Sequence, residues 1–301
     1  MIYAGDLHAP EGPVALPDGS WLIVEGGQHR GCVTWLGADG HSRSIVKKTG
    51  RPNGLAIDYK GDIWVAESQM PSLLRLTMTG ECEVVATGWN NEPFLFPNDL
   101  CFGPDGALYL TDSGVSIEDF APNNLVRKDY VDVNYDGRVY RIDPQTGSVT
   151  KLDQGLKFTN GIAFGRDTML YINETLTGDV SRYALRNGVV VGSREHFGNV
   201  IRKDAPSGWK GPDGMAFDEN GLLLVAVFGQ GDVTVLGSKG EVVRRIATNG
   251  MLPTNVAFAL PGQHRIHVTE YEHGHIETFE IEADGLPLWD GRTAQERGAI
   301  A

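Results

Sequence analysis

Short apolar runs of four to six residues recur along the chain in pairs, and a turn rich in Asp and Gly separates the two runs of each pair. Their Val, Ile, Leu and aromatic content, bounded by Gly, Asp or Pro, predicts β-strands. The pairs begin at residues 11, 53, 98, 160, 213 and 255, with spacings of 42, 45, 62, 53 and 42 residues. Such spacings fit a repeat of roughly 40–50 residues, which is the length of a four-stranded propeller blade.

Two weaker runs follow each strong pair, as at residues 232–236 and 241–246, so each unit supplies four strands. The last unit reaches only a third strand, at residues 275–281, and residues 2–6 are predicted to add the fourth. That pairing would close the ring without an exposed edge. Two stacked β-sandwiches would not explain why every unit has the same type of residue at the same position of its repeat. The sequence therefore predicts an all-β fold, a six-bladed β-propeller, with residues 1–301 as one domain.

The residue that begins each strong pair has an oxygen in its side chain. These residues are Glu11, Asn53, Asn98, Asn160, Asp213 and Asn255. Because the first strand of every blade lines the central tunnel, we expect the six to meet at one mouth, where carboxylate and amide oxygens suit a hard cation such as Ca²⁺, Mg²⁺ or Mn²⁺. An alternative is that Asn-Gly and Asp-Gly only mark a repeated turn. Glu11 fits that alternative less well, because Glu is a poor turn residue.

Composition narrows the classes of function. The formal net charge is −13, from 26 basic and 39 acidic residues, which argues against nucleic-acid binding. The sequence contains no run of 18 apolar residues, the length that a membrane-spanning helix requires. The first residues also lack a signal-peptide pattern, so we expect a cytoplasmic protein. The cysteines, Cys32, Cys82 and Cys101, are interpreted as reduced, buried thiols.

Four fragments, in order and at blade spacing, resemble the SMP-30/gluconolactonase/LRE-like family of six-bladed propellers. They are Glu11-Gly-Pro13, Pro97-Asn98-Asp99, Thr159-Asn160-Gly161 and Gly211-Pro-Asp213-Gly. The resemblance extends over nearly the whole chain and implies a metal-dependent hydrolase that opens a small lactone in the tunnel. It also implies that Glu11, Asn160 and Asp213 hold one divalent cation. Ca²⁺ is the first choice, and Zn²⁺, Mg²⁺, Mn²⁺ and Fe²⁺ are alternatives.

The same resemblance suggests roles for individual residues. Asp213 would be both a metal ligand and the general base that activates water. Asn98 would lie near the metal or the substrate. Arg51 and Asn53 are further candidates for substrate binding, although a solvated surface arginine is the alternative reading of Arg51.

Two long connections, residues 114–136 and 196–211, are expected to set substrate choice, and the first is also a candidate cover for the mouth. Within the first, the spacing from Asp132 to Asp143 is compatible with a calcium loop, but its strand-like flanks favour a hairpin turn. The pair His273-Gly-His275 is interpreted as an exposed loop pair rather than a metal site.

Other functions remain open on the sequence alone. A phosphotriesterase or a strictosidine synthase-like enzyme would use the same fold. A non-catalytic propeller that binds partners on its rim would not need two carboxylates at one mouth. Bound metal would distinguish the lactonase from the strictosidine synthase-like enzyme and from the non-catalytic propeller.

Overall fold

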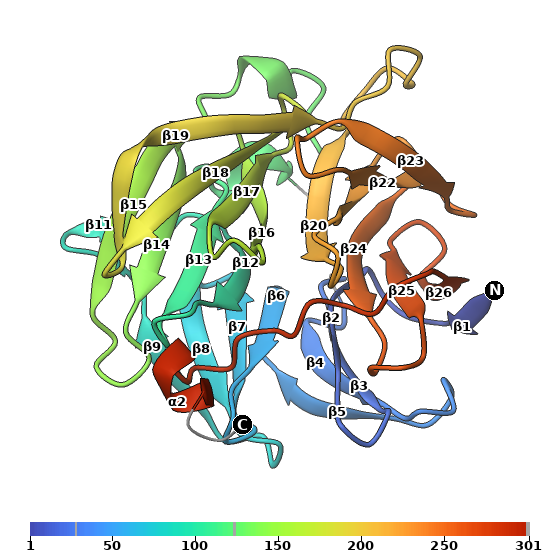
Figure 1. Cartoon of the computed structure of the whole chain (residues 1–301), viewed down its shortest axis with the longest axis horizontal. Coiled ribbons are helices and arrows are strands. Elements are labelled where there is room, and N and C mark those ends of the chain that lie inside the picture. The colour runs from blue at the N-terminus through green and yellow to red at the C-terminus, as the bar shows by residue number, and fades with distance from the viewer. Residues whose placement is uncertain (28, 123–124, 299–301) are drawn as a thin grey trace.

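The computed structural model describes residues 1–27, 29–122 and 125–298, and it is a six-bladed β-propeller (Figure 1). Each blade is a four-stranded antiparallel sheet whose first strand lies at the tunnel. Blade 1 contains β2 (Pro10–Ala15), β3 (Trp21–Glu25), β4 (Cys32–Leu36) and β5 (Arg43–Lys48). Blade 2 contains β6 (Pro52–Ile57), β7 (Ile63–Glu67), β8 (Ser72–Leu76) and β9 (Cys82–Ala86). Blade 3 contains β12 (Pro97–Phe102), β13 (Leu108–Asp112), β14 (Gly137–Ile142) and β15 (Val149–Leu156).

The second half of the ring follows the same plan. Blade 4 contains β16 (Thr159–Phe164), β17 (Leu170–Glu174), β18 (Asp179–Arg186) and β19 (Val189–Asn199). Blade 5 contains β20 (Gly211–Phe217), β21 (Leu223–Phe228), β22 (Asp232–Leu236) and β23 (Val242–Ala247). Blade 6 contains β24 (Pro253–Phe258), β25 (Arg265–Glu270), β26 (His275–Glu280) and β1 (Ile2–Ala4). The pairing of Ala4 with Ile276 confirms that the N-terminal strand completes the last blade.

Apolar side chains are packed between neighbouring blades rather than in one central core. A separate hydrophobic cluster lies at each of the six blade interfaces. Between blades 2 and 3, for example, Trp64 and Leu73 pack with Leu108 and Tyr140. Burying one such side chain stabilises a fold by about 1.5–3 kcal/mol. The second strands are therefore buried along almost their whole length, whereas outer strands such as β23 are largely exposed.

Every inner strand begins with an irregular register. In blade 4, Thr159 pairs with Glu174 and Ile162 with Ile172, so residues 160 and 161 both lie opposite Asn173. Similar register shifts occur in the other five blades. Such a β-bulge breaks the alternation of side chains and redirects them. Two successive residues can then face the tunnel mouth.

The bulges bring the inner strands very close together. A Cβ added at Gly161 would lie 2.3 Å from the carbonyl oxygen of Asp213 in blade 5. One added at Gly214 would lie 1.9 Å from Cγ of Asn255 in blade 6. These positions are glycine because no side chain fits between adjacent blades there.

A buried acid at the end of the second strand fixes the loop before each inner strand in five blades. Each carboxylate accepts a backbone N–H two or three residues before the residue at the mouth. The donors and acceptors are His8 and Glu25, Arg51 and Glu67, Phe96 and Asp112, Lys157 and Glu174, and Leu252 and Glu270. Hydrogen bonds to charged groups contribute about 1.5–3 kcal/mol each. These five acids thus have a structural role.

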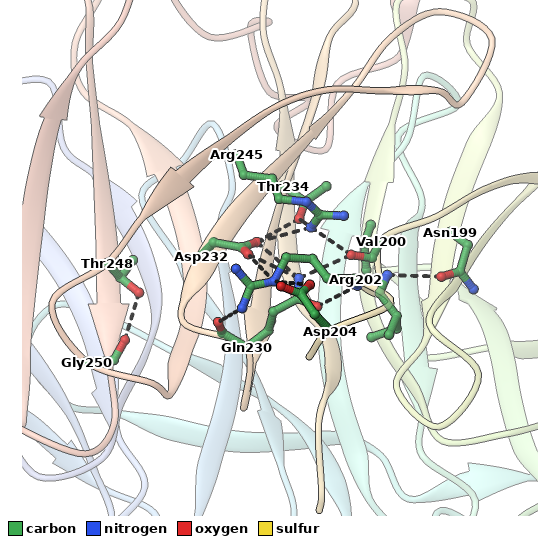
Figure 2. A network of polar contacts seen from close by, with 11 residues as sticks. Asn199, Val200, Arg202, Asp204, Gln230, Asp232, Thr234, Arg245, Thr248 and Gly250 are labelled. Carbon is green, nitrogen blue, oxygen red and sulfur yellow. Dashed lines mark hydrogen bonds and ion pairs between the residues drawn. The ribbon is translucent and has the colours of Figure 1, made fainter. Parts of the chain in front are cut away.

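Blade 5 has Val227 at this position and uses a different network (Figure 2). Gln230 Oε1 accepts the N–H of Arg202 at 2.8 Å. The buried Asp232 lies 3.8 Å from Arg202 and 3.5 Å from Arg245, and Arg245 also donates to the carbonyl oxygen of Val200 at 2.8 Å. The network therefore fixes residues 200–202, while the following segment up to Lys210 remains mostly exposed.

The segment after β26, which we call the C-terminal strap (residues 281–298), crosses the end of the tunnel opposite the mouth (Figure 1). Its backbone bonds to blade 5 through Leu286 and Phe217, to blade 2 through Asp290 and Tyr59, and to blade 3 through Ala294 and Pro104. The short helix α2 (Ala294–Gly298) ends the described part of the strap.

Two remaining expectations concern the surface. No helix in the described ranges is long and apolar enough to cross a membrane. All three cysteines are free thiols, with Cys32 buried and Cys101 partly buried. Cys82 is exposed on β9, so the expectation of a buried thiol is wrong for this residue.

We expect Gly161→Ala to lower the free energy of unfolding by about 1–3 kcal/mol, because the added methyl group would overlap the backbone of blade 5. Gly5→Ala is the matched control, since a Cβ there meets nothing within 4 Å. Urea denaturation of the two variants measures the difference. Equal stability of both would show that the inner strands are not closely packed at their starts.

Candidate active site

Five of the six residues predicted to surround the tunnel mouth do so, and in blade 6 a neighbouring residue takes the sixth place. Glu11, Asn53, Asn98, Asn160 and Asp213 occupy equivalent places at the start of the inner strands of blades 1–5. In blade 6, Pro253 pairs with Glu270 and Val256 with Val268, which puts Thr254 at the equivalent place. The prediction that Asn255 completes this ring is therefore wrong. Asn255 occupies the next position, which is glycine in blades 1, 2, 4 and 5.

Asn255 instead orients Glu11 across the junction of blades 6 and 1. Its Nδ2 donates to Oε1 of Glu11 at 2.7 Å, and its own Oδ1 accepts the N–H of Val256 at 2.8 Å. The other carboxylate oxygen of Glu11, Oε2, is buried and has no hydrogen-bond partner. Burial raises the pKa of Glu11 to about 7, although hydrogen bonds from Thr254, Asn255 and Gly12 act in the opposite direction.

Asp99 is a third carboxylate at the site, and the sequence reasoning missed it. It occupies the glycine position of blade 3, beside Asn98, and the bulge lets both residues reach the mouth. Its side chain lies over Gly54 of blade 2, as that of Asn255 lies over Gly214. Burial, and then the charge of Glu11, raise the pKa of Asp99 to about 8. The sequence did contain a signal for Asp99, because in four other blades the residue that follows the one at the mouth is glycine.

Asp213 interacts with both of these acids. Burial, followed by the charges of Glu11 and Asp99, raises the pKa of Asp213 well above its usual range. A hydrogen bond from Asn160 partly offsets this rise. Asp213 and Asn53 are partly exposed, whereas Glu11, Asn98 and Asn160 are all at most 8% exposed. Asp213 is thus the carboxylate of the ring that solvent at the mouth can reach.

Two hydroxyl groups orient the buried amides. Nδ2 of Asn98 donates to Oγ of Ser113 at 2.9 Å, and this hydroxyl donates to the carbonyl oxygen of Thr159. In the next blade, Nδ2 of Asn160 donates to Oγ1 of Thr175, which donates to the carbonyl oxygen of Pro212 at 2.8 Å. Because the nitrogen ends are used in this way, the carbonyl oxygens of the two amides remain to bind a cation or a substrate hydroxyl.

The donor set fits a hard divalent cation. Three acids lie close enough to raise one another's pKa, and one carboxylate oxygen of Glu11 is buried without a partner. Such groups are costly to bury as anions unless a positive charge compensates them. In the described part of the chain, no three His, Cys, Asp or Glu side chains form a metal-binding group by themselves. A cation here would take amide oxygens as well as carboxylates, as Ca²⁺ commonly does.

Arg51 also lies at the mouth. Its guanidinium is 5.8 Å from the ring centre of Phe96 in blade 3, and it interacts electrostatically with Tyr271 of blade 6. Burial lowers the pKa of Arg51. The alternative reading as a fully solvated surface arginine is therefore wrong.

The two long connections pack together on the mouth side of blades 3–5. The first contains α1 (Ile117–Phe120) and a 3-10 helix (Tyr130–Asp132). Trp209, from the second, lies 4.7 Å from Phe120, 4.9 Å from Phe158 and 5.3 Å from Tyr130, measured between ring centres. Such aromatic pairs contribute about 0.5–1.5 kcal/mol beyond their burial. The segments are joined into one apolar cluster beside the mouth.

Two other segments are metal candidates in the sequence. Asp132 ends a 3-10 helix, residues 137–142 form β14, and Asp136 pairs with Arg138, so the segment from Asp132 to Asp143 is not the expected hairpin turn. His275 is buried on β26 and lies 3.1 Å from Glu277. The expectation that His273 and His275 form an exposed pair is thus wrong for His275.

Comparisons with known proteins agree with this architecture. A family model described as "SMP-30/Gluconolactonase/LRE-like region" matches residues 9–272. A gluconolactonase of Zymomonas mobilis is 28% identical over 280 residues, which cover 87% of this chain and 76% of the relative. A diisopropyl-fluorophosphatase of Loligo vulgaris is 25% identical over 298 residues, covering 93% and 91%. Among solved structures, regucalcin of Agrobacterium tumefaciens superposes with a TM-score of 0.78 at 22% identity, covering 97% of this chain and 96% of that one.

In the presence of a chelator, the free energy of unfolding should fall as the pH rises from about 5 to about 8. In the folded state Glu11 and Asp99 hold their protons with pKa values of about 7 and about 8, whereas the ordinary pKa values of these groups are 4.5 and 3.8, so raising the pH removes this stabilisation. Glu11→Gln should reduce the slope and stabilise the protein at pH 8. Urea denaturation at pH 5.5 and pH 8 measures both effects.

Glu81→Gln, on an exposed turn, is the control and should leave the slope unchanged. Parallel pH profiles for the parent chain and Glu11→Gln would contradict the buried, uncompensated carboxylate.

Proposed function

The chain belongs to the SMP-30/gluconolactonase/LRE-like family, and on this premise we propose that it is a hydrolase that opens a small lactone at the tunnel mouth with the help of a divalent cation. The observation that carries the proposal is the convergence of Glu11, Asp99 and Asp213 with two oriented amides at one mouth. The gluconolactonase relative supports a lactone as the substrate.

We assign the cation to Glu11, Asn160 and Asp213, and Ca²⁺ is our first choice because all the donors are oxygen atoms. Zn²⁺, Mg²⁺, Mn²⁺ and Fe²⁺ are the alternatives. When bound, such an ion polarises an ester carbonyl and stabilises negative charge on its oxygen. Asn255 keeps one oxygen of Glu11 occupied and so directs the unpaired oxygen to this task.

Asp213 is the general base of the proposed reaction. Its partial exposure at the mouth gives water access to the carboxylate. As a water oxygen bonds to the lactone carbonyl carbon, Asp213 takes the water proton. It returns that proton to the ring oxygen when the ester C–O bond breaks, and the product is a hydroxy acid. Asn160 donates to Asp213 and keeps it aligned.

Substrate binding is assigned to groups around the base. The amide oxygen of Asn98 and the partly exposed Asn53 are suited to the hydroxyl groups of a sugar lactone. Arg51 provides a positive charge at the mouth that is suited to a carboxylate or carbonyl oxygen. The aromatic cluster around Trp209 forms one side of the approach.

A second candidate reaction is hydrolysis of a phosphorus ester. It is favoured by the match over 93% of this chain to diisopropyl-fluorophosphatase. The same cation and base would serve either reaction, so an assay must include both substrate classes.

We expect the chain to release acid from glucono-lactone or an aromatic lactone after chelator treatment only when a divalent cation is restored. Asp213→Asn should lower kcat by at least about 100-fold, because a positioned base contributes roughly 10²–10⁴-fold. The measurement is acid release with Ca²⁺, Mg²⁺, Mn²⁺, Zn²⁺ or Fe²⁺, with a phosphotriester tested in parallel.

Asp204→Asn is the matched control, because Asp204 is exposed and makes only a 3.9 Å ion pair with Arg202. It should retain full activity. Full activity in excess chelator would contradict the need for a cation, and near-normal turnover by Asp213→Asn would contradict its role. No acid release with any lactone or cation would favour a non-catalytic propeller.

A further inference from the structure

A cavity lies behind the site, in the half of the tunnel away from the mouth. It has a volume of about 360 Å³ and is bounded by all six inner strands and by strap residues Gly285–Trp289. An apolar cavity of about 150 Å³ is large enough to bind benzene. This cavity, which we call the rear chamber, is therefore large enough for a substituted aromatic ring.

Small side chains create the space. The inner-strand positions one layer below the polar residues are Val14, Ala56, Cys101, Ala163, Ala216 and Ala257. All six line the chamber and are partly exposed, although they lie inside the molecule. The next layer adds aromatic walls, formed by Phe102, Phe164, Phe217 and Phe258. Apolar side chains thus form the side walls of the chamber.

The two ends of the chamber differ. Asp99 and Asn255 form the polar end, next to the candidate active site. The strap forms the other end, where Leu286 and Trp289 pack against the blades and Leu288 is 70% exposed. Among the described residues that line the chamber, Asp99 is the one carboxylate, and Lys, Arg and His are absent.

This chemistry selects a neutral ligand. An anion would meet the Asp99 carboxyl group with no positive partner, and burying an unpaired charge costs several kcal/mol. The Asp99 carboxyl group accepts the backbone N–H groups of Leu100 and Ile162, and its remaining lone pairs can accept a hydrogen bond from a ligand hydroxyl group. The aromatic walls suit a flat apolar ring.

We infer that the rear chamber is a second binding site, distinct from the mouth, for a small neutral aromatic molecule with a hydroxyl group. The ring lies among the phenylalanines, and the hydroxyl group faces Asp99 and Asn255. The ligand enters where the strap crosses the tunnel, because the polar residues close the other end. The site does not depend on the proposed hydrolysis.

Isothermal titration calorimetry of the full chain with benzyl alcohol tests this site. The expected result is saturable one-to-one binding. Ala163→Phe, which fills the chamber, should weaken it at least tenfold, and Ala163→Leu should weaken it by a smaller factor. Sodium benzoate, the charged counterpart of similar size, should give no saturable heat at neutral pH.

Asp213→Asn separates the two sites, because it should abolish hydrolysis yet keep benzyl alcohol affinity within about twofold. Circular dichroism and thermal melting establish that each variant is folded; if Ala163→Phe is not, the Ala163→Leu affinity decides. The inference is overturned if the folded parent chain shows no saturable binding, if a folded filling variant binds equally well, if benzoate binds as tightly, or if Asp213→Asn loses binding.

Discussion

The close approach of six bulged strands at one end of the tunnel is the constraint on which the candidate site depends. Four glycines allow the strands to come within contact distance, and each bulge sends two neighbouring residues toward the mouth. Acids on separate blades are thereby held near one another although their charges repel. The energy for this arrangement comes from the six apolar interfaces between blades. The fold can therefore concentrate negative charge at its centre without losing its packing.

Around this centre, each blade uses the same device to hold its loop. A buried carboxylate at the end of the second strand binds backbone N–H groups just before the site residue. Blade 5 departs from the pattern and replaces the acid with the Gln230–Asp232–Arg245 network, which fixes the chain at Arg202, eleven residues before Asp213. The blade that carries the proposed base thus has the longest stretch of chain between its anchor and its site residue. Trp209 partly compensates by packing against Phe120 and Phe158.

Much of the fold was predictable because each blade of a propeller repeats the same pattern of strands and turns in the sequence. The starts of the inner strands, the pairing of the N-terminal strand with the last blade, and the meeting of Glu11, Asn160 and Asp213 all followed from spacing and family resemblance. The positions of Asp99 and Thr254 at the site were not predicted. A β-bulge changes which of two adjacent residues faces the tunnel, and the alternation of polar and apolar residues in the sequence does not reveal a bulge. The loss of one glycine in blade 6 shifted Asn255 by one position for the same reason. The rear chamber was also hidden, since it arises from small residues on six blades together with a strap distant in sequence.

The hydrogen bond between Glu11 and Asn255 joins residues 244 positions apart, across the seam where the first and last blades meet. During synthesis on the ribosome, Glu11 emerges early but finds its partner only after almost all of the chain has followed. Fragments produced by premature termination or by a protease cut that removes the last blade would contain most of the polar residues yet leave Glu11 unoriented. Assembly of the centre is thereby linked to the integrity of the polypeptide, because a partial product would lack the contact that orients Glu11.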